Sequence, residues 1–251
     1  MADTSADRTI EEERELLRSL CAKGGVVFFG GAGVSTESGI PDFRSPDGLY
    51  NQQYDYPPEQ IISRSFFDAH PEEFYRFYRD RVIFTDARPN PAHRTLARLE
   101  REGLLNAVVT QNIDGLHQAA GSRTVYELHG SIHRNHCMRC HAVYPLDFIV
   151  QTGKDDPRAL PLCPACGGLV KPDVVLYEEP LDDRVITGAV RAISQATTLI
   201  IAGTSLVVYP AAGFIDYFKG RHLVVINRTP TSRDAGADLL IRHNVGEVFD
   251  W

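Results

Sequence analysis

Four of the five cysteines form two pairs with the spacing of a metal site. Cys137 and Cys140 make the first Cys-x-x-Cys pair, and Cys163 and Cys166 make the second. Two such pairs can surround one tetrahedral Zn²⁺ with four thiolates, which leaves no open position for catalysis. The spacing therefore predicts a structural zinc site, with an iron–sulfur cluster or disulfides as the alternatives.

A glycine-rich segment directly follows an apolar run and could bind phosphate. Gly31, Ala32 and Gly33 come after residues 26–29, and the backbone N–H groups of such a turn can approach a pyrophosphate. The spacing is not Gly-x-Gly-x-x-Gly, and no acidic ribose ligand is easily placed about 20 residues further on. This argues against hydride-transfer chemistry. An ordinary tight turn between strand and helix is the alternative.

Two polar loops are further candidates for ligand binding. Asp42, Phe43 and Arg44 could cover a flat cationic ring and bind phosphate, or they could form a solvent loop with a packed Phe. Residues 110–117 (Thr-Gln-Asn-Ile-Asp-Gly-Leu-His) follow a second apolar run. Their amide and carboxylate groups can bond a carboxamide or ribose hydroxyls, or they can cap a helix.

His129 is the candidate general base. It stands beside Gly130 at the end of a strand-like segment, and the unperturbed pKa of histidine lies near neutrality. Most lone histidines are structural, so this assignment needs support from other residues. Three histidines in or beside the cysteine region compete for the role: His133, His136 and His141.

Alternating strands and helices position these motifs. Strands are predicted at 26–29, 106–110, 198–202 and 222–226, and helices at 11–22, 92–102, 182–195 and 211–219. This alternation predicts an α/β fold with a doubly wound parallel sheet, whose ligands bind where the strands end. The aromatic-rich stretch 42–81 and the cysteine-bearing stretch 133–170 break the rhythm and predict a smaller lobe. A further strand at 174–177 either connects elements or pairs with an extended peptide.

Composition narrows the class of protein. The 251 residues include 26 Lys and Arg against 33 Asp and Glu, so the net charge of −7 argues against a general nucleic-acid or anionic-membrane binder. No run of about 18 apolar residues predicts a membrane span. Residues 1–15 lack the features of a secretory signal, which predicts a cytoplasmic protein with a flexible tail at 1–8.

Together, these motifs resemble those of the sirtuins, which are NAD-dependent protein lysine deacylases. The matching segments occur in the family's order: 31–35, 38–44, 110–117, 129–130, the two cysteine pairs, 172–179, 203–210 and Asn227. The resemblance implies a catalytic domain over 9–250 with a Rossmann-like large part and a zinc-ribbon/helical lobe. The large part spans about 9–45, 82–130 and 175–250. The lobe comes from insertions at about 46–81 and 131–174, with zinc bound between 137 and 166.

The resemblance also implies a role for each matched residue, with NAD as co-substrate. The residues expected at the phosphates and the nearby ribose are Gly31, Ala32, Gly33, Thr36 and Arg44, and those expected at the nicotinamide are Phe43, Ile113 and Asp114. The nicotinamide ribose is expected to contact Gln111 and Asn112. The adenosine half is expected to contact Thr204, Ser205, Asn227 and Val245, and Asp42 and Gly203 complete the set. His129 is then the general base. Val175 and Tyr177 line the acyl-lysine tunnel, and the peptide pairs between 174–179 and 206–209.

The implied reaction removes acetyl or another neutral acyl group from a protein lysine and gives nicotinamide and O-acetyl-ADP-ribose. The alternatives are a mono-ADP-ribosyltransferase or NAD hydrolase using the same pocket, a longer-chain deacylase, and a non-enzymatic zinc-ribbon adaptor. Acetylated proteins or peptides are the expected partners of a monomeric enzyme. Membranes and nucleic acids are not expected partners.

Two departures from the family's pattern bear on specificity. Glu178 stands where a Gly is common in the substrate strand. Members that remove succinyl groups carry Tyr-x-x-Arg in the acyl pocket. Aligning residues 75–78 with that motif puts Tyr78 at the position of the Arg, which predicts a preference for neutral acyl groups. Arg79 or Arg81 takes the place of that Arg if the alignment shifts.

Overall fold

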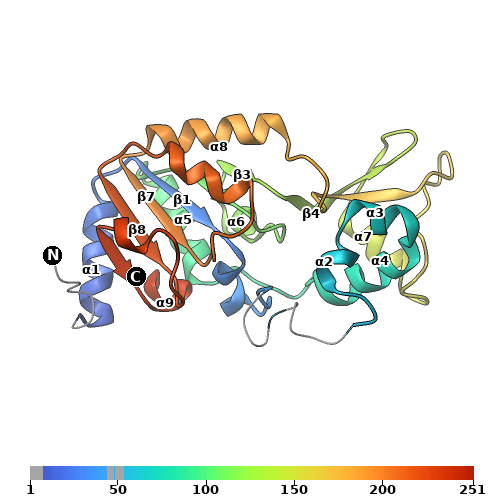
Figure 1. Ribbon diagram of the computed structural model, residues 1–251, viewed down its shortest axis with the longest axis horizontal. Helices are drawn as coiled ribbons and strands as arrows, with labels where there is room; N and C mark the ends of the chain where they lie inside the picture. Colours follow the sequence, from blue (N-terminus) through green and yellow to red (C-terminus); the bar gives the residue numbers. More distant parts are fainter. Residues whose placement is uncertain (1–7, 44–47, 49–53) are drawn as a thin grey trace.

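A six-stranded parallel sheet forms the body of the molecule (Figure 1). The computed structural model describes residues 8–43, 48 and 54–251, so residues 1–7 of the predicted tail lie outside it. The strand order is β3-β2-β1-β7-β8-β9, which is the Rossmann order, and the predicted fold class is confirmed. The strands are β1 Val26–Gly30, β2 Leu105–Thr110, β3 Val125–Glu127, β7 Thr198–Ala202, β8 His222–Ile226 and β9 Leu239–Ile241.

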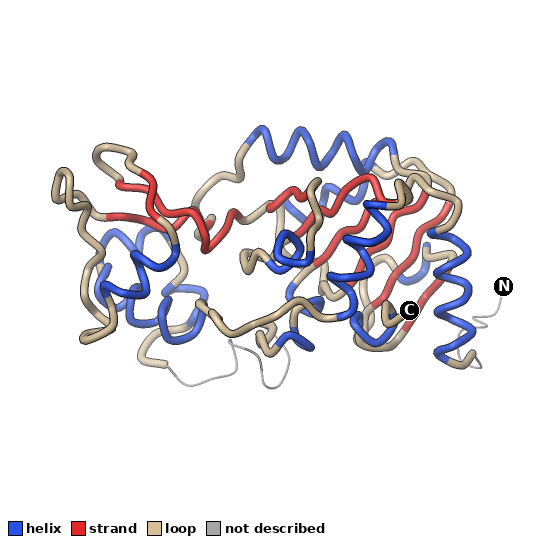
Figure 2. Tube along the Cα trace, turned by 180° about the vertical axis from the view of Figure 1, so that it is seen from behind, coloured by secondary structure: helices blue, strands red, loops and turns tan. Residues whose placement is uncertain are grey.

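Both faces of this sheet are buried beneath helices. Along β1, Val26 and Phe28 pack into one apolar cluster, while Val27 and Phe29 pack into another, as expected for side chains that alternate across a strand. The first cluster includes residues of α1 (Ile10–Cys21), α5 (Pro91–Arg101) and α9 (Val245–Val248). The second includes residues of α8 (Asp183–Gln195) and η6 (Ala211–Tyr217). Figure 2 shows α8 along one side of the sheet.

Helix starts follow from local capping. Thr9 and Glu12 form a capping box at the start of α1, the Asn90 side chain accepts from the Ala92 N–H at the start of α5, and Asp182 caps α8. The helix predicted at 211–219 is a 3₁₀ helix that ends at Tyr217. Another short helix, α6 (Leu116–Ala120), begins after a Gly in the left-handed region.

A smaller lobe lies at the end of the molecule opposite α1 (Figure 1). Its sheet has the order β5-β4-β6, formed by Val143–Tyr144, Gly130–Cys137 and Val170–Val174. Its helices are α2 Pro58–Ile61, α3 Arg64–Ala69, α4 Pro71–Phe77, a π-helical turn η5 over Tyr78–Val82, and α7 Leu146–Thr152. One apolar cluster joins Phe67, Phe74 and Tyr75 to Ile132 and Val170. The two insertions therefore share one core.

The strand predicted at 174–177 is displaced toward the N-terminus. β6 ends at Val174, because the backbone of Tyr177 is bonded elsewhere: its N–H donates to the Ile62 carbonyl at 3.0 Å, and its carbonyl accepts from the Arg64 N–H at 3.0 Å. Pro172 does lie on an edge strand, as predicted, because β6 pairs with β4 alone. None of the helices in residues 8–43 and 54–251 is long and apolar enough to cross a membrane.

Candidate active site

Backbone hydrogen bonds connect the loops after β1, β2, β7 and β8 to neighbouring strands at the carboxyl edge of the sheet. The Gln111 N–H donates to the Gly30 carbonyl at 2.9 Å, and the Gly203 N–H donates to the Ile226 carbonyl at 3.0 Å. After β8, the Asn227 N–H donates to the Ile241 carbonyl at 3.0 Å. Each predicted polar loop is thus placed beside the next.

Gly33 and Gly203 interlock, although 170 positions separate them. The Gly33 N–H donates to the Gly203 carbonyl at 2.9 Å. A Cβ on Gly33 would lie 2.8 Å from the Gly203 Cα, and a Cβ on Gly203 would lie 2.5 Å from the Val34 nitrogen. Gly203 also has φ of +59°, which favours glycine. Two backbones can touch here only because neither residue carries a side chain.

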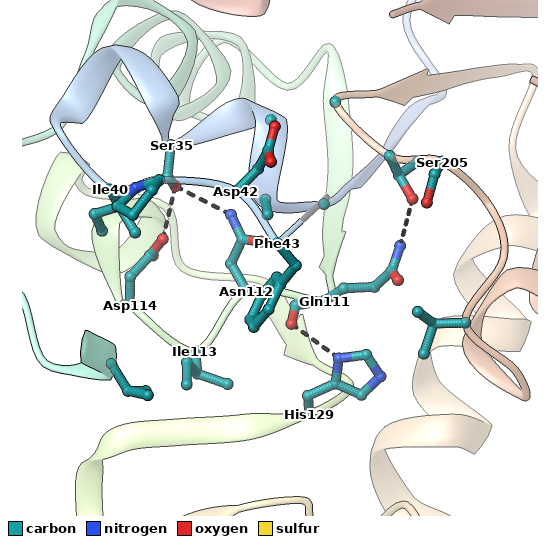
Figure 3. A pocket seen from close by; sticks show the side chains of 18 of the residues that line it. Ser35, Ile40, Asp42, Phe43, Gln111, Asn112, Ile113, Asp114, His129 and Ser205 are labelled. Atoms are coloured by element: carbon teal, nitrogen blue, oxygen red, sulfur yellow. Dashed lines mark hydrogen bonds between the residues drawn. The ribbon is translucent and has the colours of Figure 1, made fainter. Parts of the chain in front are cut away.

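A cavity of about 530 Å³ opens onto this edge (Figure 3). Of the predicted NAD residues, fifteen line it: Gly31, Ala32, Gly33, Thr36, Asp42, Phe43, Gln111, Asn112, Ile113, Asp114, Gly203, Thr204, Ser205, Asn227 and Val245. His129, Val175 and Tyr177 line it too. Arg44, the remaining predicted NAD contact, lies outside the described residues. The predicted set thus surrounds one space.

Ser35 organises the polar side of the cavity. Its buried hydroxyl donates to Asp114 Oδ2 at 2.6 Å and accepts from Asn112 Nδ2 at 3.0 Å (Figure 3). Asp114 Oδ1 accepts from the Leu116 N–H at 2.9 Å. On the far side, Gln111 Nε2 donates to Thr204 Oγ1 at 3.0 Å. These bonds hold the amide and carboxylate groups in place before any ligand binds.

The contacts of His129 set its tautomer. Its Nδ1 lies 3.0 Å from the Gln111 carbonyl oxygen, which can only accept, so Nδ1 carries the proton and Nε2 keeps a free lone pair. Burial lowers the pKa of His129, against a smaller raising effect of the Gln111 bond. The imidazole is therefore neutral near pH 7, as a general base must be.

Gly130 places the base at the junction between the sheet and the smaller lobe. It has φ of +77°, and a Cβ there would lie 1.8 Å from the Asp173 carbonyl oxygen. The Val175 N–H donates to the His129 carbonyl at 3.0 Å. The base and the predicted acyl-lysine segment are thereby hydrogen-bonded to one another.

The other histidines considered from the sequence lie elsewhere. His133 Nε2 is 3.1 Å from the Asp114 carbonyl, and its side chain is exposed and does not line the cavity. His117, at the end of the 110–117 motif, is fully buried between Phe28 and His93, with ring centroids 6.0 and 4.7 Å away. Neither ring nitrogen of His117 has a hydrogen-bond partner among the described residues. It is a core residue rather than a ligand-facing one.

The four paired cysteines converge on one point. Their sulfurs all lie within 4.8 Å of one another, with Cys137 and Cys166 at 3.4 Å and Cys140 and Cys163 at 3.6 Å. Disulfides need about 2.05 Å, whereas the edge of a zinc–thiolate tetrahedron with 2.3 Å bonds is about 3.8 Å. The backbone N–H groups of Arg139 and Cys140 point at the Cys137 sulfur, which favours its thiolate. The donor set fits one structural Zn²⁺.

Comparison with known proteins shows the family of this chain. The model of the Sir2 family matches residues 31–210. The chain belongs to the Sir2 family. It is 54% identical to the NAD-dependent protein deacetylase of Clostridium acetobutylicum, covering 96% of this chain and 98% of that protein. It is 55% identical to the enzyme of the same name from Clostridium perfringens, covering 97% and 98%.

Solved Sir2 structures share the whole architecture. A Sir2 variant with deacetylated p53 peptide and 3′-O-acetyl ADP ribose superposes with a TM-score of 0.86 at 38% identity, covering 94% of this chain and 95% of the other. A complex of Sir2 with p53 peptide and NAD⁺ gives a TM-score of 0.83 at 38% identity, with 96% of each chain covered. The resemblance read from the sequence is confirmed.

This Sir2 chain also has cavity residues that sequence reasoning missed. They lie mainly at the end of the cavity within the smaller lobe: Ile62, Phe74, Val82, Phe84 and Ile132. The aromatic-rich stretch was a usable signal, but it indicated only a packed lobe. Of the two ends of the 75–78 segment aligned with the acyl pocket, Tyr78 lines the cavity and Tyr75 does not. Tyr75 is fully buried and donates to the Val170 carbonyl, whereas Tyr78 and Arg81 line the cavity.

Proposed function

We propose that this chain removes acetyl groups from protein lysine side chains, with NAD as the co-substrate. The products are the free lysine, nicotinamide and O-acetyl-ADP-ribose. One observation carries the proposal: the free Nε2 of a neutral His129 faces the same cavity as the glycine loop and the Gln111–Asp114 cluster. The family membership and the names of the relatives agree with it.

Different parts of the cavity wall bind different parts of NAD. The turn Gly31–Gly33 and the hydroxyl of Thr36 hold the phosphates, since the small residues of the turn let the pyrophosphate approach the backbone. Ile113, Asp114 and Phe43 hold the nicotinamide, and Gln111 and Asn112 hold its ribose. The adenosine half lies along the loops after β7 and β8, with Thr204, Ser205, Asn227 and Val245. Arg44 joins the residues at the phosphates and the nearby ribose, and Asp42 and Gly203 complete the set.

His129 acts on the nicotinamide ribose. The acyl oxygen of the substrate attacks C1′ as nicotinamide leaves, and His129 Nε2 then accepts a proton from a ribose hydroxyl. That hydroxyl attacks the former amide carbon, and water completes the release of lysine. The Gln111 carbonyl keeps the imidazole in the right tautomer and stabilises its protonated form afterwards.

The acyl-lysine enters between the two parts of the molecule. Val175 and Tyr177 line its tunnel, and the peptide backbone pairs between residues 174–179 and 206–209. The large part spans about 9–45, 82–130 and 175–250, and the lobe spans about 46–81 and 131–174. The zinc of the lobe supplies no reacting group, because four thiolates close its coordination shell. It holds β4 and the 163–166 turn together.

Product analysis tests this proposal. The purified protein is incubated with an acetyl-lysine peptide and NAD, and all products are followed by mass spectrometry. We expect deacetylated peptide, nicotinamide and O-acetyl-ADP-ribose in equal amounts, and no turnover when NAD is left out. Nicotinamide and ADP-ribose without deacetylated peptide would instead establish NAD hydrolysis, and ADP-ribosylated protein would establish transfer.

A further inference from the structure

Strained backbone stands on both sides of the proposed peptide cleft. Among the described residues, the non-glycine residues with positive φ are His141, Glu178 and Leu206. Glu178 has φ of +76° and belongs to the 174–179 segment, and Leu206 has φ of +56° and belongs to the 206–209 segment. Residues held in such conformations are often found at ligand sites, where the surrounding structure keeps them in place. Each wall of the cleft therefore has one such residue.

Both walls also have backbone groups available to a peptide. No described residue bonds to the backbone N–H or carbonyl of Glu178, or to those of Val207 in the opposite wall. Tyr177 differs, because its N–H and carbonyl are bonded to Ile62 and Arg64. Free backbone donors and acceptors of this kind can pair with an added extended peptide. A peptide that pairs with the Glu178 backbone runs beside the Glu178 side chain.

The carboxylate of Glu178 is held in position by uncharged donors. Its Oε2 accepts from the Ser65 N–H at 2.8 Å, and its Oε1 accepts from the Ser65 hydroxyl at 2.9 Å. The Glu178 side chain is exposed and lines the cavity. A carboxylate has about four lone-pair positions, so two bonds leave room for a further donor. The group is thus fixed but not neutralised.

The neighbouring cations are paired with other carboxylates. Arg64 Nε lies 2.9 Å from Asp68 Oδ2, and the Arg64 guanidinium lies 3.1 Å from Glu179 Oε1. Lys171 Nζ lies 2.9 Å from Glu179 Oε2. Within the described residues, two cations thus serve three carboxylates here, and Glu178 is the one without an ion-pair partner. An unpaired charge beside a substrate favours a substrate group of opposite sign.

The opposite wall offers an apolar and aromatic surface. Tyr209 lines the cavity and is 73% exposed, and the adjacent Val207 is 57% exposed. Arginine and lysine have a hydrocarbon stem that can cover such a surface, and their charged ends are attracted to aromatic faces and to carboxylates. An acidic side chain placed there would instead bring two like charges together.

We propose that Glu178 makes this chain favour acetyl-lysine sites with an arginine or lysine within two positions of the modified lysine. The inference rests on the proposed function, because it concerns the peptide that enters the same cavity. Glu178 determines specificity in this proposal and takes no part in bond making. Its bonds to Ser65 hold the carboxylate in place before the peptide binds, which lowers the entropy cost of pairing.

The test uses peptides that differ in the charge of one residue. Arginine, citrulline or glutamate is placed in turn at positions −2, −1, +1 and +2 of an otherwise neutral acetyl-lysine peptide, and kcat and KM are measured at saturating NAD. Citrulline has nearly the shape of arginine without its charge. At one position or more, we expect kcat/KM for arginine to exceed that for citrulline by about two- to fivefold, and glutamate to fall below citrulline. The difference should lie in the peptide KM and shrink in about 1 M NaCl, where the Debye length is about 3 Å.

Variants assign the preference to one carboxylate. Glu178→Gln keeps an oxygen acceptor for Ser65 but removes the charge, so the arginine-to-citrulline ratio should fall to about one. Glu178→Lys should invert the order and make glutamate the best of the three. Glu72→Gln is the matched control, because Glu72 is an exposed carboxylate of the smaller lobe that does not line the cavity, and the ratio should be unchanged. Thermal unfolding confirms that each variant is folded.

The outcomes separate this inference from the proposed function. Deacetylation of the arginine, citrulline and glutamate peptides at equal kcat/KM would overturn the inference and leave the deacetylase intact. A merely structural role for Glu178 would lower kcat/KM for every peptide alike in Glu178→Gln, and an arginine preference unchanged in that variant would overturn the assignment. Absence of both peptide deacetylation and NAD consumption would overturn the two proposals together.

Discussion

Gly203→Ala tests whether the contact between the two glycine turns builds the NAD site. The new Cβ would lie 2.5 Å from the Val34 nitrogen and 2.7 Å from the Gly33 carbonyl carbon, both of them backbone atoms. To reach an ordinary contact of 3.4 Å, the two loops must separate by about 0.9 Å. The φ of +59° adds roughly 1–2 kcal/mol for any residue with a side chain.

The clash and the backbone strain together predict a loss of stability and a loss of NAD binding. We expect the free energy of unfolding to fall by about 2–4 kcal/mol, which lowers Tm by roughly 4–16 °C in a chain of this length. A displacement near 1 Å at the pyrophosphate loop should lower kcat/KM for NAD by about 10- to 100-fold. The assays are a thermal melt and a titration of NAD at saturating acetyl-lysine peptide.

Two other glycines provide matched controls. Gly103 has φ of +74°, but a Cβ added there would meet no atom within 4 Å, so Gly103→Ala carries the backbone strain alone. Gly236 has neither a positive φ nor a neighbour within 4 Å, so Gly236→Ala should change little. If Gly203→Ala binds NAD as well as Gly103→Ala does, the interlocked turns do not shape the site and the reasoning fails.

Four further predictions follow from the geometry. His129→Ala should keep zinc and the native Tm yet lose deacetylation by at least about 100-fold, and a variant with native kcat would remove the residue from the mechanism. Cys137→Ala should lose bound zinc, measured by metal analysis, and with it most of the activity, whereas active zinc-free protein would contradict the structural role. Burial lowers the pKa of His93 to about 4 and that of His117 well below 6.5, so the unfolded chain binds more protons in acid. The free energy of unfolding should therefore be insensitive to these groups above about pH 6.5. Below that pH it should fall by about 1.4 kcal/mol per pH unit for His93 down to about pH 4, and His117 should steepen the fall. Urea titrations independent of pH would refute this. Glu178 has φ of +76°, and its carboxylate accepts from the N–H and hydroxyl of Ser65. Both Glu178→Ala and Glu178→Gly remove that carboxylate, but only the Ala variant keeps the backbone strain, so it should be less stable by about 1 kcal/mol. Equal melting temperatures would argue against backbone strain at this position.

Local sequence patterns predict many of the strands and helices. The predicted bounds of β7 and β8 match the structure at both ends, because each strand is one apolar run closed by Gly203 or Asn227. The cysteine pairs were readable for a similar reason, since Cys-x-x-Cys spacing brings two sulfurs together within a single turn. In both cases the sequence pattern that made the prediction spans only a few residues.

Side-chain direction in the smaller lobe could not be read in this way. Residues 74–82 are rich in aromatic and basic side chains, and a helical period alone does not say which of them face the core. Packing against Val170 from the other insertion took Tyr75 away from the cavity, whereas Tyr78, which is equally buried, and Arg81 line it. Similarly, bonds from Ile62 and Arg64 to Tyr177 ended β6 at Val174.

The sequence by itself determined the order of strands and helices, the zinc ligands and the residues gathered at the sheet edge, because parallel strands bring their carboxyl ends to one side whatever lies between them. Tertiary structure decided the rest. It put His129 in the cavity and His117 in the core, although both follow strands, and it pressed Gly33 against Gly203 across 170 positions. These positions depend on which segments, far apart in the sequence, pack together and exclude water. Patterns over a few neighbouring residues do not contain that information.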